Sequence, residues 1–181
     1  MSPVGHNTWT LQLVPKSQYD YERLSSFFAP LLSEQYEAHI FDLFLNTKIH
    51  GGNPLYLRAL SDSNHWIGIL IGMTFMPYHK TARRYLLLDC LHREFDPDRP
   101  LGYISMIGIV DSEQKRGVGT SLLNKAIEFM KDFNCQKVFF ETVQSNETMI
   151  GFGSKFGFEI IDKLPNFYRN GIDAVRMFLT L

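Results

Sequence analysis

The first half of the chain changes its hydrophobic spacing several times. Apolar and polar side chains alternate from Thr8 to Val14, which is typical of a strand. Apolar residues then recur every three or four positions in two helix-like segments with Pro30 at the break, and Ser61-Asp62-Ser63-Asn64 separates two strand-like runs. The pattern predicts a strand at 8–14, helices at 19–32 and 34–45, and a hairpin of strands at 55–60 and 66–75.

The segment from residue 77 to residue 100 has no decisive pattern. Tyr85 to Leu88 is apolar and fits a strand or a helix, because so short a run has no readable period. Glu94 to Pro100 has the composition of a loop. We therefore assign no helix or strand between residues 77 and 100.

Strands and helices alternate in the second half. Tyr103 to Val110 is a nearly continuous apolar run, as expected of a strand buried on both faces. Gly117 to Phe133 has one apolar and one charged face, which predicts an amphipathic helix. Ser145-Asn146 is a typical N-cap for a short helix, and Gly157 is a typical stop for it. Further strands are expected at 137–143, 158–162 and 174–181.

In chain order the elements run β-α-α-β-β-(?)-β-α-β-α-β-β. Alternating strands and helices imply at least one parallel crossover. A length of 181 residues suits one domain. We expect residues 1–181 to form a single α/β domain, with one mixed sheet and helices on both faces.

Composition narrows the class of protein. The chain is 45% hydrophobic with a net charge of −1, so it has no basic field to attract nucleic acid or an anionic membrane surface. The N-terminus lacks the features of a signal peptide, and the apolar stretch at 66–76 is too short to span a bilayer. Cys90 and Cys135 leave one disulfide open but favour a reduced protein. We expect a soluble cytoplasmic protein without nucleic-acid or membrane partners.

The segment from Gln114 to Thr120 has the chemistry of an anion site. It joins the apolar strand to the amphipathic helix, whose first N–H groups lack partners inside the helix. Gly117 and Gly119 let a ligand approach the backbone, and Lys115 and Arg116 add positive charge. The segment is neither a P-loop nor a dinucleotide fingerprint, because the further lysine or glycine of those motifs is absent. A simple turn before a surface helix is the alternative.

Two blocks of the chain resemble the GNAT superfamily of acetyl-CoA-dependent N-acetyltransferases. Gln114-x-x-Gly117-x-Gly119 is similar to the family motif Gln/Arg-x-x-Gly-x-Gly/Ala. Residues 139–159 are similar to its strand–Asn–helix–Gly-Phe segment, with Asn146 as the asparagine and Gly157-Phe158 as the last pair. The resemblance covers residues 101–181, and residues 1–100 match only in the order of elements.

The resemblance implies a mostly antiparallel sheet with a splayed central strand pair, and acetyl-CoA as the donor lying in the gap. The pantetheine arm would pair with the backbone of Ile107, Ile109 and Val110. Asn146 would bond the cofactor near the pantetheine, with a pure helix cap as the alternative. The pyrophosphate would be held by backbone N–H groups of Lys115, Arg116, Gly117, Val118, Gly119 and Thr120.

Glu141 is the candidate general base. It lies in the apolar run 138–143, where burial would raise its pKa, and its position resembles the glutamate of enzymes that acetylate ribosomal-protein N-termini. The alternative is a solvated or salt-bridged carboxylate at a strand end. Tyr103 matches a position at which several N-terminal acetyltransferases carry a catalytic tyrosine. Its alternative is an aromatic residue at a strand edge.

One departure from the family concerns the general acid. The family commonly has Phe-Tyr in the helix after the asparagine, whereas this chain has Phe152-Gly153. Tyr168 is a candidate replacement, or the thiolate leaves unassisted. Restoring tyrosine at 153 is expected to raise turnover or leave it unchanged, unless another side chain such as Tyr168 already fills the space.

The resemblance leads to an N-acetyltransferase acting on a primary amine of a small molecule or a peptide N-terminus. The alternative is an acyl-CoA-binding module with little turnover, motivated by Gly153. A homodimer is left open, and the six histidines show no ligand spacing, so no metal is expected. Several acidic residues are candidates to face the acceptor, with a solvated surface as the alternative: Glu34, Glu37, Glu94, Asp96 and Asp98.

Overall fold

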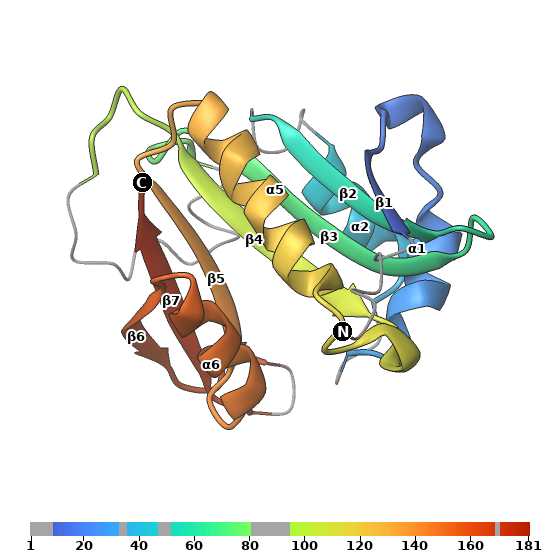
Figure 1. Cartoon of the computed structure of the whole chain (residues 1–181). Coiled ribbons are helices and arrows are strands. Elements are labelled where there is room, and N and C mark those ends of the chain that lie inside the picture. Colours follow the sequence, from blue (N-terminus) through green and yellow to red (C-terminus); the bar gives the residue numbers. More distant parts are fainter. Residues whose placement is uncertain (1–8, 33–35, 47–51, 81–94, 169–170) are drawn as a thin grey trace, which may run out of the picture.

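Seven strands form one sheet in the order β1-β2-β3-β4-β5-β7-β6 (Figure 1). The computed structural model describes residues 9–32, 36–46, 52–80, 95–168 and 171–181. The strands are β1 (Trp9–Leu13), β2 (Pro54–Ser61), β3 (Trp66–Phe75), β4 (Leu101–Ile109), β5 (Lys137–Val143), β6 (Glu159–Leu164) and β7 (Ala174–Thr180). The pair β4–β5 is parallel, and the other neighbouring strands pair antiparallel.

Helices lie on both faces of this sheet. In Figure 1, α5 and α6 lie in front of the sheet, and α1 and α2 lie behind it. The α-helices are α1 (Tyr21–Phe28), α2 (Ala38–Leu45), α5 (Val118–Asp132) and α6 (Glu147–Lys155), and the short 3-10 helices are η1 (Lys16–Gln18) and η3 (Asp111–Glu113). The mixed, mostly antiparallel sheet with helices on both faces is thus confirmed.

Two predicted helices were too long. The first ends at Phe28 rather than Leu32, because Pro30 lacks an N–H and cannot continue the helical bonds. Its start is fixed by Asp20, whose side chain accepts a hydrogen bond from the Arg23 N–H at 3.0 Å. The second helix begins at Ala38 instead of Glu34. The ambiguous run from Tyr85 to Leu88 lies outside the described residues.

Separate hydrophobic clusters fill the two faces. Against one face, α5 packs its predicted apolar side, with Leu122, Ala126 and Met130 at 0% exposure. Against the other face, Phe28 of α1 stacks on Phe41 of α2, with ring centroids 5.8 Å apart. Because both faces of the sheet are covered, the sequences of β3 and β4 are nearly continuous apolar runs.

Beyond their first residues, the two central strands separate. The register pairs Leu101–Tyr103 of β4 with Lys137–Phe139 of β5 and goes no further. On its other side β4 stays paired with β3 as far as Ile109. The β3 pairing shifts by one residue at Ser105, whose hydroxyl donates to the Ile71 carbonyl at 3.1 Å. This bulge turns β4 beside the point where it leaves β5, which confirms the expected splayed pair.

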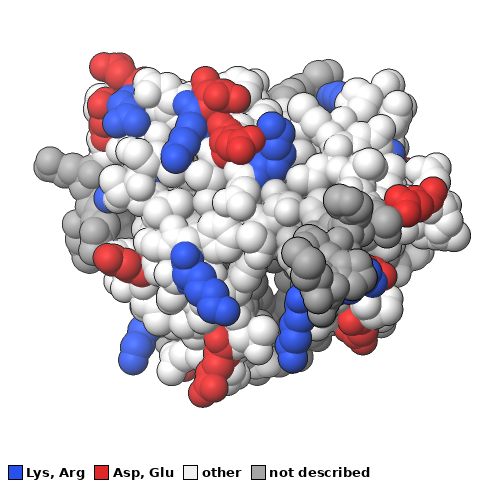
Figure 2. Space-filling view, viewed as in Figure 1, with Lys and Arg blue, Asp and Glu red and all other residues white. Residues whose placement is uncertain are grey.

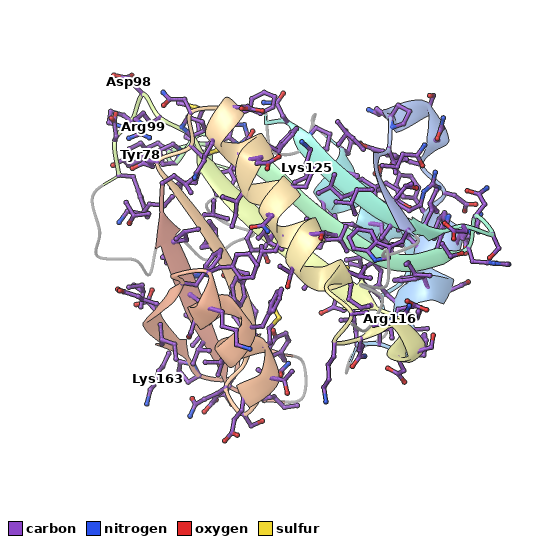
Figure 3. All side chains as sticks on the ribbon, in the orientation of Figure 1. Tyr78, Asp98, Arg99, Arg116, Lys125 and Lys163 are labelled. Carbon is purple, nitrogen blue, oxygen red and sulfur yellow. The ribbon has the colours of Figure 1, made fainter. Side chains whose placement is uncertain are left out.

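The loop before β4 is held in place by a buried glutamine. Gln136 accepts a hydrogen bond from the Asp96 N–H and donates to the carbonyls of Asp96 and Arg99. Figure 3 shows Tyr78, Asp98 and Arg99 together at this corner, and the Tyr78 hydroxyl donates to the Phe95 carbonyl. This corner lies at the end of the sheet where β4 and β5 are still paired.

The surface carries charges of both signs. Figure 2 shows Lys and Arg side chains interspersed with Asp and Glu on the face that carries α5 and α6. Among the helices of the described ranges, none combines the length and the apolar character needed to cross a membrane. Cys135 is buried and has a free thiol, whereas Cys90 lies outside the described residues.

Candidate active site

A cleft of about 450 Å³ lies where β4 and β5 separate. Its walls are Ile104–Ile107 of β4, Phe140–Val143 of β5 and the start of α6. Leu31, Leu32 and Tyr36, which follow α1, close one side, and Tyr168 after β6 closes another. The divergence of two parallel strands therefore creates a site between unpaired strand edges.

The edge of β4 that faces this gap offers backbone hydrogen-bonding groups. Alternate residues of a strand direct their N–H and C=O groups to opposite sides. The Val110 N–H bonds to the Ile67 carbonyl of β3 at 3.0 Å, so Ile107 and Ile109 direct their groups toward the gap. The backbone of Val110, which was also expected to pair with the pantetheine arm, is already engaged within the protein. Its N–H and its carbonyl are both already bonded, the carbonyl to the Glu113 N–H at 2.9 Å, because the chain turns into η3 there.

The start of α5 forms the predicted concave turn. Lys115 and Gly117 both have positive φ, at 59° and 90°. Ser121 donates to the Gly117 carbonyl at 3.0 Å, which leaves the N–H groups of Val118 to Thr120 at the open end of the helix. The Gln114 side chain donates to the Ile109 carbonyl and to Asp111. It therefore ties this turn to the end of β4, beside the gap.

Positive charge at this turn is partly neutralised. Arg116 lies at the N-terminal end of α5 in Figure 3, and its guanidinium is 3.0 Å from the Glu113 carboxylate. The pair is exposed on the arginine side, with a side-chain exposure of 53%. The groups of this turn that could hold an anion are therefore mainly its backbone N–H groups, as at other helix N-termini.

Asn146 caps α6 and also lines the cleft. Its Oδ1 accepts a hydrogen bond from the Met149 N–H at 3.0 Å, which confirms the predicted N-cap. The side-chain NH2 group is not used by this bond. Gly157 has φ +87°, and Phe158 donates to the Gly153 carbonyl, which confirms the predicted end of the helix. The cap and the cofactor contact are therefore compatible roles.

Glu141 lines the cleft and is paired with an arginine. Arg176 of β7 lies directly opposite it, and the Arg176 Nε donates to the Glu141 Oε1 at 2.6 Å. Burial raises the pKa of Glu141, and Arg176 and the Tyr103 hydroxyl oppose this rise. Sequence reasoning missed Arg176, although a single cation in the apolar strand 174–180 was a signal of the same kind as Glu141.

Tyr103 lies beside Glu141 but outside the lining of the cleft. It pairs with Phe139 at the last paired position of β4 and β5, and the two rings have centroids 4.9 Å apart. Burial and the neighbouring Glu141 carboxylate raise the pKa of Tyr103 well above its usual value. Its phenol therefore stays protonated beside the Glu141 carboxylate.

The departure at Gly153 has a structural explanation. Gly153 is buried and faces the ring of Phe140 in β5, which occupies the space next to it. The alternative in which another side chain already fills the space at 153 is therefore favoured, with Phe140 rather than Tyr168 as that side chain. Tyr168 lines the cleft, as expected of the residue proposed to replace it.

The acidic candidates that the structure describes, Glu37, Asp96 and Asp98, are not among the residues that line the cleft. Asp96 accepts a hydrogen bond from the Asp98 N–H, at the corner shown in Figure 3, and Glu37 is 3.2 Å from His39. Glu34 and Glu94 lie outside the described residues. Within the described part of the chain, no group of three or more His, Cys, Asp or Glu is arranged to hold a metal ion.

Comparison with known proteins agrees with this architecture. The splayed sheet, the glycine turn and the cleft are the features that the resemblance to acetyl-CoA-dependent transferases implies. A model of the acetyltransferase (GNAT) family matches residues 21–158. The chain belongs to this family. Its fold is similar to that of Arabidopsis thaliana NAA60 solved with acetyl-CoA, with a TM-score of 0.76 and 21% identity over 96% of this chain and 99% of that one.

Several relatives of this chain are named N-alpha-acetyltransferases. N-alpha-acetyltransferase 30 of Schizosaccharomyces pombe is 25% identical over 92% of this chain and 96% of its own length. The protein of the same name from Xenopus laevis is 35% identical over 44% of this chain, and the match spans 29% of that protein. The higher identity is thus confined to a shorter segment, and the yeast relative covers nearly the whole chain.

Proposed function

We propose that this protein transfers an acetyl group from acetyl-CoA to the α-amine of a peptide N-terminus. The observation that carries the proposal is the gap between β4 and β5, where unpaired backbone meets a cleft lined by Glu141. Family membership supports acetyl-CoA as the donor. The names of the relatives support a peptide N-terminus over a small-molecule amine as the acceptor.

Three groups of residues support binding of successive parts of acetyl-CoA. The backbone of Ile107 and the N–H of Ile109 are available to pair with the pantetheine arm like an added strand, while the Ile109 carbonyl already accepts from the Gln114 side chain. Open N–H groups of the turn from Lys115 to Thr120 are suited to the pyrophosphate. The amide NH2 group of Asn146 is placed to donate near the pantetheine.

Glu141 is the proposed general base. An N-terminal ammonium must lose a proton before its nitrogen can attack the thioester carbonyl. Acetyl-CoA supplies the acetyl group as a thioester, so a C–N bond forms, the C–S bond breaks and a proton passes to the leaving sulfur. Glu141 accepts the ammonium proton, and Tyr103 adjusts the basicity of its carboxylate. Tyr168, which lines the same cleft, is the candidate donor of a proton to the sulfur.

A thiol-release assay with acetyl-CoA tests the proposal. The acceptors are peptides with a free α-amine, the same peptides with that amine blocked, and small-molecule amines. We expect release with the free peptides alone, and mass spectrometry should locate the acetyl group on the first residue. Release with small amines but not peptides would contradict the peptide acceptor. Acetyl-CoA binding without release from any acceptor would favour a binding module. The cytoplasmic location and the homodimer stay predictions.

A further inference from the structure

A buried ion pair lies behind the cleft, between β5 and β7. Glu141 and Arg176 are register partners, so their side chains lie on the same face of the sheet. The side chain of Arg176 is 0% exposed and that of Glu141 is 3% exposed. Two charges removed from water in this way need each other, because either one alone would be costly to bury.

The two oxygens of the Glu141 carboxylate have different surroundings. Oε1 is held by the Arg176 Nε at 2.6 Å. Oε2 is also buried and accepts no hydrogen bond of ordinary distance and angle among the described residues, although the Tyr103 hydroxyl lies close enough to the carboxylate to lower its pKa. Glu141 lines the cleft, so one oxygen is fixed from behind while the other retains its capacity to accept a proton.

Arg176 is itself fixed by its neighbours. Its guanidinium carbon lies 5.5 Å from the centre of the Phe139 ring. On the side away from Glu141, Arg176 pairs in register with Asp162 of β6. A guanidinium remains charged at every pH at which an enzyme can be assayed, so it is a constant source of positive potential.

We propose that Arg176 is a positioning residue, which keeps Glu141 ionised and aims its Oε2 at the ammonium group of the acceptor. This inference rests on the proposed function, because it assigns Glu141 the role of base. It explains why β7 carries an arginine in an otherwise apolar strand. A purely structural ion pair would not require the carboxylate to keep an unsatisfied oxygen beside a cleft.

The charged and titratable groups around Glu141 determine the sign of the expected effect. Arg176 faces it from β7 and Tyr103 from β4, while Tyr168 interacts with Tyr103 and Asp162 lies beyond Arg176. Burial raises the pKa of Glu141, and Arg176 opposes this rise more strongly than Tyr103 does. Loss of the arginine charge should therefore raise this pKa further and move the acidic limb of the rate profile to higher pH.

The test is the pH dependence of kcat for wild type, Arg176→Gln, Arg176→Lys and Tyr103→Phe with one good peptide acceptor. We expect Arg176→Gln to move the acidic limb upward by about one pH unit or more, as for loss of a nearby opposite charge. Arg176→Lys and Tyr103→Phe should produce smaller shifts in the same direction. On the alkaline plateau, kcat of Arg176→Gln should stay within about tenfold of wild type, since the base is ionised there again.

A fall in kcat by the same factor at every pH, with an unmoved acidic limb, would overturn the inference, because Arg176 would then be structural. If Arg176→Gln does not melt cooperatively, Arg176→Met, which is also neutral and suits an apolar strand, replaces it in an infrared titration of the Glu141 carboxyl, assigned by subtracting the spectrum of Glu141→Gln. An unmoved carboxyl titration in Arg176→Met would overturn the inference as well. Wild-type protein that releases no thiol with any acceptor would instead contradict the proposed function, while the infrared titration still measures the effect of Arg176.

Discussion

The ring of Phe140 in β5 fills the space next to the Cα atom of Gly153 in α6. A Cβ atom on Gly153 would lie 2.7 Å from Cζ of the Phe140 ring, closer than such atoms approach in folded proteins. The same ring packs on Phe158, with centroids 5.0 Å apart. The large residue in the strand thus fills the space that a larger residue in the helix would need. In this chain α6 therefore provides no side chain at 153 that could act on the leaving sulfur.

Gly153→Tyr is accordingly expected to destabilise the protein and to weaken acetyl-CoA binding. Overpacking of a well-filled core typically costs about 1–3 kcal/mol, and here the clash involves a ring beside the cleft. Thermal melts and calorimetry with acetyl-CoA measure the two effects. Phe140→Ala alone should also destabilise, by about 3–5 kcal/mol.

The double variant Phe140→Ala with Gly153→Tyr is the matched control. Because the new ring can enter the space that Phe140 leaves, the double variant should be more stable than Phe140→Ala alone. Wild-type melting and binding in Gly153→Tyr would show that Phe140 moves aside at little cost, and the argument from volume would be wrong.

Local signals in the sequence were sufficient for most of the fold. The bounds of β3 and β5 follow directly from their apolar runs, and the cap at Asn146 and the stop at Gly157 follow from residue type. The errors arose where a neighbouring residue, in the chain or in space, determines where an element ends or which backbone groups are engaged. Pro30 shortened α1, and the turn into η3 engaged the backbone of Val110.

Long-range register could not be predicted from a single sequence. Glu141 and Arg176 lie 35 residues apart, and nothing local indicates that β7 brings them face to face. The contact between Phe140 and Gly153 has the same origin, because it depends on how α6 lies on the sheet. The glycine turn at the start of α5 could be predicted because its chemistry resides in consecutive residues, whereas Glu141 and Arg176 come from separate strands.

Gly117 allows a test of the anion site that separates charge from backbone strain. Its φ of 90° is in the left-handed region, so any side chain there should cost about 1–2 kcal/mol of stability. Gly117→Ala and Gly117→Glu share this cost, and only the glutamate adds a negative charge. We expect Gly117→Glu to lose at least about tenfold in acetyl-CoA affinity relative to Gly117→Ala, or ~1.4 kcal/mol.

Calorimetry with acetyl-CoA and denaturant melts of both Gly117 variants measure the two quantities. A carboxylate near a helix N-terminus is itself favourable, so Gly117→Glu should be no less stable than Gly117→Ala. Lower affinity without lower stability is thus the signature of a phosphate site. Equal affinities of the two variants for acetyl-CoA would show that the pyrophosphate does not bind at this turn.

Glu141→Gln tests the assignment of the base. The substitution keeps the shape and an oxygen for Arg176 but removes the basicity. Proton removal by a positioned side chain contributes about 10²–10⁴-fold, and we expect kcat to fall by that order with acetyl-CoA binding nearly intact. The pKa of Glu141 is raised by burial, so in wild type kcat should decrease as the pH falls through this pKa.

In the variant that acidic limb should be absent. The measurement is a pH–rate profile of both proteins with the same peptide, together with a melt to show that the variant is folded. If Glu141→Gln keeps more than about a third of the wild-type kcat, far from the contribution of a base, and the same profile, then Glu141 is structural. Proton removal would then pass to Tyr103, to a water chain or to bulk solvent.

Asn146 offers a way to separate a helix cap from a cofactor contact. Its Oδ1 caps α6 by accepting from the Met149 N–H, whereas its NH2 group is the part proposed to donate to acetyl-CoA. Asn146→Asp keeps the cap and removes the donor, while Asn146→Ala removes both. We expect Asn146→Asp to melt like wild type and Asn146→Ala to lose about 0.5–2 kcal/mol of stability.

Both variants of Asn146 should bind acetyl-CoA roughly 3- to 10-fold more weakly, as for one hydrogen bond of about 0.5–1.5 kcal/mol. Because an added charge can weaken binding through repulsion, the Asn146→Asp affinity is measured at low and high salt, and the loss should persist at high salt. Wild-type affinity in the folded Asn146→Asp variant would mean that Asn146 serves α6 alone.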